Sequence, residues 1–308
     1  MSGTQPKKRL RWFQYSLRSL LLLTLLVSVG MSWIMYRVRK AERQRRAVQA
    51  IEALGGQVHY EYQYVGEDHR YNYKSIRPQF DWWRPEWLVE RLGYDFFYRV
   101  EWANVWTDEG VKHLRGLPDL RSITLVRFTR ASPLAWWLRG DSSVTDDGLA
   151  YLKEFSQLRH LCGPPSVLRY LRDLPQLQSL SLNGTKTTDA DLQHLSQAPQ
   201  LQQLGLRYTE ITDKGLECLT PLTKLKGLHL RGTRITDAGL RKLMCLVNLE
   251  SLELDRTSIT ADGFEMLKNL PHLRWLGVGD KQVTEDGVKK LQQTLPNCEI
   301  DRLYHNQP

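Results

Sequence analysis

Motifs for catalysis and metal binding are missing from this sequence. Its 308 residues contain no Gly-x-Ser-x-Gly nucleophile motif, no His-Glu-x-x-His zinc motif, no Walker loop and no dinucleotide fingerprint. The eight histidines show no metal-ligand spacing. The four cysteines include no Cys-x-x-Cys pair, so we predict buried thiols that pack as small apolar groups rather than a zinc site or a disulfide scaffold. We expect no catalytic residues, no metal and no cofactor.

An excess of positive charge is also missing from most of the chain. Residues 1–46 hold eleven Lys and Arg residues against one acidic residue, whereas residues 47–308 hold 32 basic and 33 acidic residues. A nucleic-acid-binding domain needs its positive charge on the folded surface that meets phosphate. Because the net charge of +9 comes from residues 1–46, we predict no nucleic-acid partner.

An apolar run of 18 uncharged residues separates Arg18 from Arg37. As a helix it would be about 27 Å long, close to the thickness of a thin bilayer core. We therefore predict a basic tail at 1–18 and a transmembrane helix at 19–37. A cleaved signal peptide is the alternative, but the apolar run continues past the small residues at 28–30. Five basic residues precede the run and six follow it within ten residues, so the positive-inside rule predicts neither orientation.

The next segment, 38–56, is basic in its first half. Its second half carries an apolar stripe made of Ala47, Val48, Ile51 and Leu54. This spacing predicts a juxtamembrane helix that stops at Gly55-Gly56. We favour a solvated spacer that lifts a domain off the membrane over a helix that packs against a partner.

A 24-residue repeat fills the C-terminal two thirds of the chain, with four copies in one register that begin at residues 187, 211, 235 and 259. The copy at 235–258 reads ITDAGLRKLMCLVNLESLELDRTS. Its first leucines recur every three residues, which predicts a helix capped by Thr236 and Asp237. Leu252 and Leu254 predict a short strand. We expect the hydroxyl of a threonine after each strand to hold the following turn, at Thr185, Thr209, Thr233 and Thr257.

The pattern T-D-x-G-L…L-x-x-L-x-L-x-x-T resembles the leucine-rich repeat. The resemblance covers 106–300, with an insertion at 130–143 and a tail at 301–308. Together with the apolar run, it makes the chain similar to bacterial membrane-anchored leucine-rich-repeat proteins. That resemblance implies an α/β solenoid of horseshoe form, with strands lining the inner face and helices the outer face, on a single-pass protein of the bacterial cell membrane. It implies no active site.

Residues 57–105 hold fourteen aromatic side chains in 49 residues. We predict a capping region, because the open end of a repeat array exposes apolar surface that must be covered. An aromatic ligand site is the alternative. Within this region the sequence predicts a strand over 58–62, a short helix over 85–92, and an incomplete first repeat strand over 100–102.

Residues that flank the strand leucines point away from the core, and equivalent positions in neighbouring strands form columns. The C-terminal columns gather the candidate partner-binding residues: Arg207, Tyr208, His229, Arg231, Glu253, Asp255 and Trp275. We expect Arg231 beside Asp255, and His229 beside Glu253. Either these are surface ion pairs worth about 0–1 kcal/mol each, or they belong to a binding patch anchored by aromatic side chains.

The insertion contains Trp136 and Trp137, which we expect to fold back onto the cap or the helices. Contact with lipid headgroups or with a partner is the alternative, because exposed tryptophans usually touch something.

The sequence therefore predicts a membrane-anchored scaffold that binds a protein partner of unknown identity through its concave strand face. It is not expected to be an enzyme. One alternative is an enzyme acting on an envelope polymer, with Glu253 and Asp255 in catalysis, although nothing predicts the raised pKa or the enclosing pocket that such chemistry needs. A purely structural envelope protein is another alternative.

Overall fold

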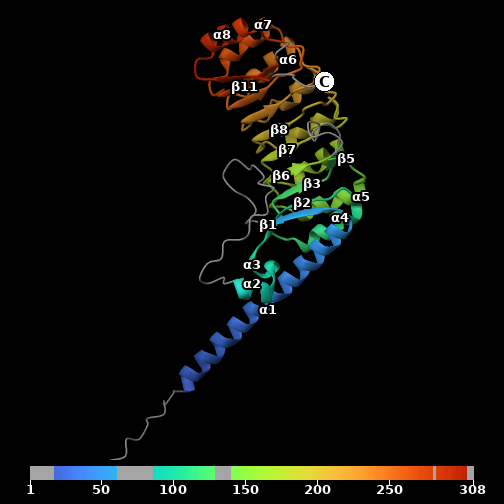
Figure 1. Ribbon diagram of the computed structural model, residues 1–308, viewed down its shortest axis with the longest axis vertical. Helices are drawn as coiled ribbons and strands as arrows, with labels where there is room; N and C mark the ends of the chain where they lie inside the picture. The colour runs from blue at the N-terminus through green and yellow to red at the C-terminus, as the bar shows by residue number, and fades with distance from the viewer. Residues whose placement is uncertain (1–16, 61–85, 129–139, 280–281, 304–308) are drawn as a thin grey trace, which may run out of the picture.

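The computed structural model describes residues 17–60, 86–128, 140–279 and 282–303. It is a stack of repeats in which each unit adds one strand to a continuous sheet and one short helix to the opposite face (Figure 1). The predicted α/β solenoid with a long apolar N-terminal helix is confirmed.

The sheet has ten strands in the order β1-β2-β3-β6-β7-β8-β9-β10-β11-β12. Its strands are β1 (Gln57–Tyr60), β2 (Val100–Asn104), β3 (Ser122–Thr124), β6 (His160–Cys162), β7 (Ser179–Ser181), β8 (Gln203–Gly205), β9 (Gly227–His229), β10 (Ser251–Glu253), β11 (Trp275–Gly279) and β12 (Glu299–Leu303). β1 runs antiparallel to β2, and the other neighbours are parallel. A separate hairpin joins β4 (Arg127–Phe128) to β5 (Gly140–Asp141) at the base of the insertion.

The helical side of the stack mixes short α-helices with 3-10 helices. The α-helices are α4 (Asp108–His113), α5 (Asp146–Leu149), α6 (Asp237–Lys242), α7 (Ala261–Glu265) and α8 (Glu285–Thr294). The 3-10 helices are η2 (Leu114–Gly116), η3 (Ala150–Glu154), η4 (Pro165–Asp173), η5 (Asp191–Gln197), η6 (Gly215–Leu219), η7 (Leu243–Cys245) and η8 (Met266–Asn269). Leucines spaced three apart suit this mixture, because a 3-10 helix places residues i and i+3 on one side.

The repeat leucines form one continuous core. In the copy at 235–258, Leu240, Leu252 and Leu254 are fully buried, as are their counterparts in the neighbouring copies. The predicted threonine turns are confirmed, since each hydroxyl donates to the backbone carbonyl three residues earlier at 2.6–2.7 Å, in Thr185, Thr209, Thr233 and Thr257.

The Thr-Asp pair at the start of each repeat links one repeat to the next. Thr236 caps α6 as predicted, by accepting a hydrogen bond from the Ala238 amide. Asp237 was predicted to cap the same helix, but its carboxylate accepts hydrogen bonds from the backbone amide and the hydroxyl of Thr260 in the following repeat, at 2.9 and 2.6 Å. Asp189 and Asp213 make the same pair of bonds one repeat apart. The aspartates therefore form a ladder along the stack.

The apolar run and the juxtamembrane segment form a single helix, α1 (Leu17–Ala53). Its first half projects away from the repeats (Figure 1), and its apolar side chains there are exposed. This half is long and apolar enough to cross a membrane, although a signal sequence has the same length and composition.

The second half of α1 corrects our prediction of a solvated spacer. Ala47, Val48 and Ile51 are buried in the same core as the repeat leucines, and Lys40 forms an ion pair with Asp119 at 2.5 Å. These three residues of the apolar stripe thus cover the first repeats, whereas Leu54 is exposed. α1 continues without a break from the projecting segment into the folded domain.

The region between α1 and the repeats holds α2 (Glu86–Leu92) and α3 (Tyr94–Phe97) beside α1 (Figure 1). β1 and α2 lie where a strand and a short helix were predicted, and β2 pairs with β3 as the incomplete first repeat strand. Many of the region's aromatic residues lie in 61–85, outside the described residues.

The cysteines are free, but they are not uniformly buried. Cys298 is buried, and desolvation raises its pKa to about 11. Cys162 and Cys218 are partly buried, whereas Cys245 is exposed. The prediction of buried thiols is therefore wrong for Cys245, which lies at the outward end of the short helix η7.

Candidate functional site

The parallel register of β8 to β11 aligns the predicted columns. Gln203, Gly227, Ser251 and Trp275 pair in succession, as do Gly205, His229, Glu253 and Gly277. The leucine between the two columns points into the core. The columns therefore lie on the open strand face, as the 24-residue period predicts, with Gln203, His229, Ser251 and Trp275 at least partly exposed and Glu253 buried.

The seven candidate residues come together on this face, and we call them the concave patch: Arg207, Tyr208, His229, Arg231, Glu253, Asp255 and Trp275. They lie on β9, β10 and β11 and in the turns that follow β8, β9 and β10. Two ion-paired groups and one tryptophan make up the patch.

Glu253 is the centre of the first group. Its carboxylate accepts from Arg207 Nε at 2.6 Å and lies 3.1 Å from His229 Nδ1, while Arg207 Nη2 is 3.1 Å from the same ring nitrogen. Burial by itself would raise the pKa of Glu253, but the hydrogen bond from His229 and the charge of Arg207 outweigh it, so its pKa lies below the usual value. A general acid needs the opposite shift, which weighs against a catalytic role for Glu253.

Asp255 is the centre of the second group. Its side chain is fully buried, and its carboxylate lies 3.0 Å from Arg231 Nε. That nitrogen is also 2.6 Å from the Tyr208 hydroxyl oxygen, and the guanidinium lies 5.7 Å from the Tyr208 ring centre. The interpretation of these carboxylates as surface ion pairs is therefore wrong, because both are buried by side chains of neighbouring repeats. Removing one partner of such a pair typically costs about 3–5 kcal/mol.

Tyr208 occupies a strained backbone position. Its φ is +53°, and the equivalent positions are Gly184, Gly232 and Arg256, with φ values of +70°, +68° and +56°. A left-handed conformation costs a non-glycine residue roughly 1–2 kcal/mol. A Cβ at Gly232 would lie 2.5 Å from the Tyr208 ring, so Gly232 leaves the space into which this ring packs. Gly232 was not predicted as part of the patch, although the sequence shows that glycine and larger residues alternate at this position every 24 residues.

Trp275 completes the patch. It is half-buried, and its indole lies over Gly277, where a Cβ would meet the ring at 2.7 Å and the Glu253 side chain at 3.3 Å. Gly277 therefore leaves the space that the indole occupies beside the first ion-paired group. Trp136 and Trp137 lie outside the described residues.

Metal chemistry finds no support in the part of the chain that is described. No group of three or more His, Cys, Asp or Glu side chains there could hold a metal ion. The charged residues of the concave patch pair with one another instead.

The repeats that carry the patch match a known family. The family model described as Leucine Rich repeat matches residues 198–219 and 222–244, which span the helices and strands around β8 and β9. The chain carries leucine-rich repeats. A search of the curated proteins finds no match to it.

Solved structures with a similar chain path include three bacterial proteins. Internalin C2 of Listeria monocytogenes is 23% identical with a TM-score of 0.47, and the match covers 67% of this leucine-rich-repeat protein and 80% of the internalin. A second Listeria internalin, internalin F, is 22% identical, with a TM-score of 0.39 and coverage of 63% and 64%. A leucine-rich-repeat protein of Leptospira interrogans is 19% identical, with a TM-score of 0.41 and coverage of 62% and 50%. This chain thus matches half of the Leptospira protein's length.

Proposed function

We propose that this leucine-rich-repeat protein is a membrane-anchored scaffold that binds a protein partner through the concave patch. The observation that carries the proposal is the clustering of aromatic and arginine side chains on the open strand face, since these residue types dominate binding hot spots. Extended repeat arrays offer such faces for binding.

The internal pairing of the patch indicates how it recognises a partner. Both arginines already face carboxylates, so the patch offers shape, ring surfaces and hydrogen-bonding edges rather than a net charge. The strained backbone at Tyr208 adds support, because such strain persists where a side chain has a use and the surroundings over-determine it. Side chains that these contacts already hold in place lose less freedom on binding, which lowers the entropic cost.

The projecting half of α1 supports the membrane part of the proposal. Because the second half of the same helix packs into the repeat core, a continuous helix joins the anchor to the repeats. The concave patch is then presented by a domain that packs directly on the anchor helix. Topology reporters fused after Pro308 would decide on which side of the membrane this happens.

Site-specific photo-cross-linking in native membranes tests the binding face. A photo-reactive residue at Ser251, the register neighbour of Trp275, should give a discrete cross-linked product, whereas one at Arg241 on α6 should not. Trp275→Ala should reduce the Ser251 product by about tenfold or more, in line with the loss of a hot-spot side chain. Trp106→Ala, at the other end of the stack, is the matched control and should leave it unchanged.

The same experiment separates this function from the alternative of a purely structural envelope protein. Equal cross-linking from Ser251 and Arg241, or a Ser251 product insensitive to Trp275→Ala, would contradict a discrete binding face. Thermal unfolding of both tryptophan variants checks that the repeats remain folded.

A further inference from the structure

We propose that α2 and α3 form a second membrane contact, which places Trp87, Leu92 and Tyr94 in the headgroup region of an anionic lipid surface beside the point where α1 leaves the bilayer. The inference rests on the proposed function, because it requires α1 in the membrane. It adds a lipid-binding surface that is separate from the concave patch.

Exposed apolar side chains gather on these two short helices. Among the described residues beyond Tyr36, five large apolar side chains are exposed: Leu54, Trp87, Leu92, Tyr94 and Val247. Three of the five lie on α2, α3 or the residues between them, with exposed fractions of 64% for Trp87, 36% for Leu92 and 45% for Tyr94. Val89 of the same helix is buried, so α2 is held on the protein by one side and leaves Trp87 outside. A cluster of this kind marks a contact surface.

The position of α3 on α1 fixes the depth of this cluster. Arg37, the first charged residue after the apolar run, donates to the Phe96 carbonyl at 3.0 Å, and its guanidinium lies 5.6 Å from the Phe96 ring and 5.7 Å from the Trp33 ring. Arg45 donates to the Leu92 carbonyl at 3.2 Å. Arg37 and Arg45 are about 12 Å apart along the helix axis. α2 and α3 therefore lie level with the first turns after the apolar run.

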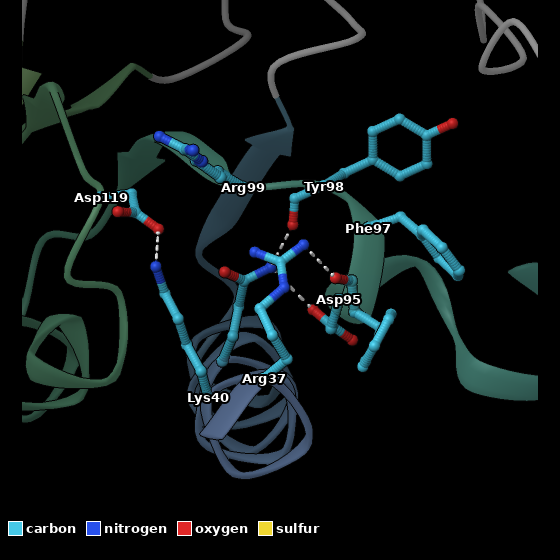
Figure 2. A pocket seen from close by; sticks show the side chains of 9 residues that line it. Arg37, Lys40, Asp95, Phe97, Tyr98, Arg99 and Asp119 are labelled. Carbon is cyan, nitrogen blue, oxygen red and sulfur yellow. Dashed lines mark hydrogen bonds and ion pairs between the residues drawn. The ribbon is translucent and has the colours of Figure 1, made fainter. Parts of the chain in front are cut away.

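The contacts in this region hold α3 on α1. Figure 2 shows Arg37 and Lys40 extending from α1 toward the chain at Asp95–Arg99 and Asp119. Gln44 is buried and donates to both the Tyr98 carbonyl at 2.9 Å and the Asp95 carboxylate at 3.1 Å. Figure 1 shows α2 and α3 at the end of the folded domain from which the free part of α1 projects. Among the described residues outside α1, these two helices would be the first that a membrane around that part reaches.

The positive charge around α2 and α3 favours an anionic lipid surface. Residues 37–46 and 86–99 together hold eight basic and four acidic residues, a net charge of +4, in a chain whose remaining repeats are balanced. Arg39, Arg43, Arg46, Arg91 and Arg99 are exposed among them. Tryptophan and tyrosine favour the membrane interface, and basic residues near the surface favour anionic headgroups. A lipid surface satisfies both features.

Brominated lipids test the inference, because they quench tryptophans that reach the bilayer. The full-length protein is reconstituted into vesicles of phosphatidylglycerol and brominated phosphatidylcholine, and the quenchable fluorescence is compared among Trp33→Phe, Trp87→Phe and Trp275→Phe. Trp33 reports on the α1 anchor, and Trp275 on the concave patch is the matched control. We expect the quenchable share to fall in Trp33→Phe and, by a comparable amount, in Trp87→Phe, but not in Trp275→Phe.

The outcomes separate the two proposals. If the quenchable share of the fluorescence falls in Trp33→Phe but not in Trp87→Phe, the second contact is overturned and the anchor stands. No loss in either variant would overturn the anchor itself. When phosphatidylglycerol is omitted, the quenching that depends on Trp87 should fall, while the quenching that depends on Trp33 persists. Unchanged quenching of Trp87 would refute the assignment to an anionic surface. Trp87 is largely exposed, so Trp87→Phe should leave the thermal midpoint unchanged.

Discussion

Replacing Ile51 by alanine tests whether helix α1 is built into the repeat domain. Ile51 is fully buried at the end of α1, and its Cγ2 lies so close to Gly56 that a Cβ there would meet it at 2.6 Å. The change removes three carbons, at roughly 0.8 kcal/mol each, and leaves a cavity that the packed surroundings fill only in part. We therefore expect Ile51→Ala to destabilise the N-terminal repeats by about 3 kcal/mol.

The assay is urea unfolding of the full chain in detergent micelles, followed by tryptophan fluorescence and circular dichroism. With an m-value of roughly 1–3 kcal/mol/M, a loss of about 3 kcal/mol lowers the urea midpoint by on the order of 1 M or more. Because repeat arrays unfold in segments, the change should be largest for Trp102 and Trp106, near β2 at the same end of the stack.

Leu26→Ala provides the matched control. Leu26 lies in the projecting half of α1, where 69% of it is exposed, so this change should leave the unfolding midpoint of the repeats in place. Equal midpoints for Ile51→Ala and Leu26→Ala would refute the reasoning. The second half of α1 would then be a spacer after all, and the repeats would not be packed against it.

Three further predictions concern the patch and the ladder. Folding lowers the pKa of Glu253, so its carboxylate stabilises the fold at pH values above its unfolded pKa of about 4.3, and this stability is lost as the pH falls through the lower folded pKa. Glu253→Gln should therefore flatten the dependence of the thermal midpoint on pH in this acidic range. An unaltered profile would count against the buried pairing. Gly232→Ala should lower the free energy of unfolding by about 1–3 kcal/mol, because of the positive φ and the clash with the Tyr208 ring. In a double-mutant cycle, the same change should cost less in a Tyr208→Gly background, where the ring is absent. Additive effects of the two changes would show that the ring does not pack there. Asp213→Ala removes the bonds to the Thr236 amide and hydroxyl, at 2.8 and 2.6 Å, and should lower stability in thermal unfolding by about 1–2 kcal/mol; an unchanged midpoint would mean that water replaces the ladder at no cost.

Much of the fold could be predicted because the same pattern of apolar residues recurs in each repeat. The leucines of 235–258 specify a helix and then a strand, and the constant 24-residue period aligns equivalent positions in neighbouring strands. The placement of Glu253 beside His229 followed from that period, and so did the turn held by Thr257.

Other features depend on what a neighbouring element supplies. The apolar stripe that includes Ile51 was visible in the sequence, but a stripe does not reveal which surface will cover it, and a spacer was wrongly preferred. Asp237 was interpreted as a helix cap because it stands at a helix start, yet Thr260 of the next repeat offers two donors to its carboxylate. Periodicity describes one chain segment at a time and does not rank competing partners.

The sequence by itself determined the repeat, its register and the membership of the concave patch, since these follow from the spacing of apolar residues along one chain. Only the tertiary structure decided that Asp255 is fully buried, that Tyr208 adopts a left-handed backbone, and that α1 joins the core. The physical reason is that burial and strain arise from side chains of other repeats. Arg231 and Gly232 come from a different turn of the stack than Asp255 and Tyr208, and their contacts exist only once the units are stacked.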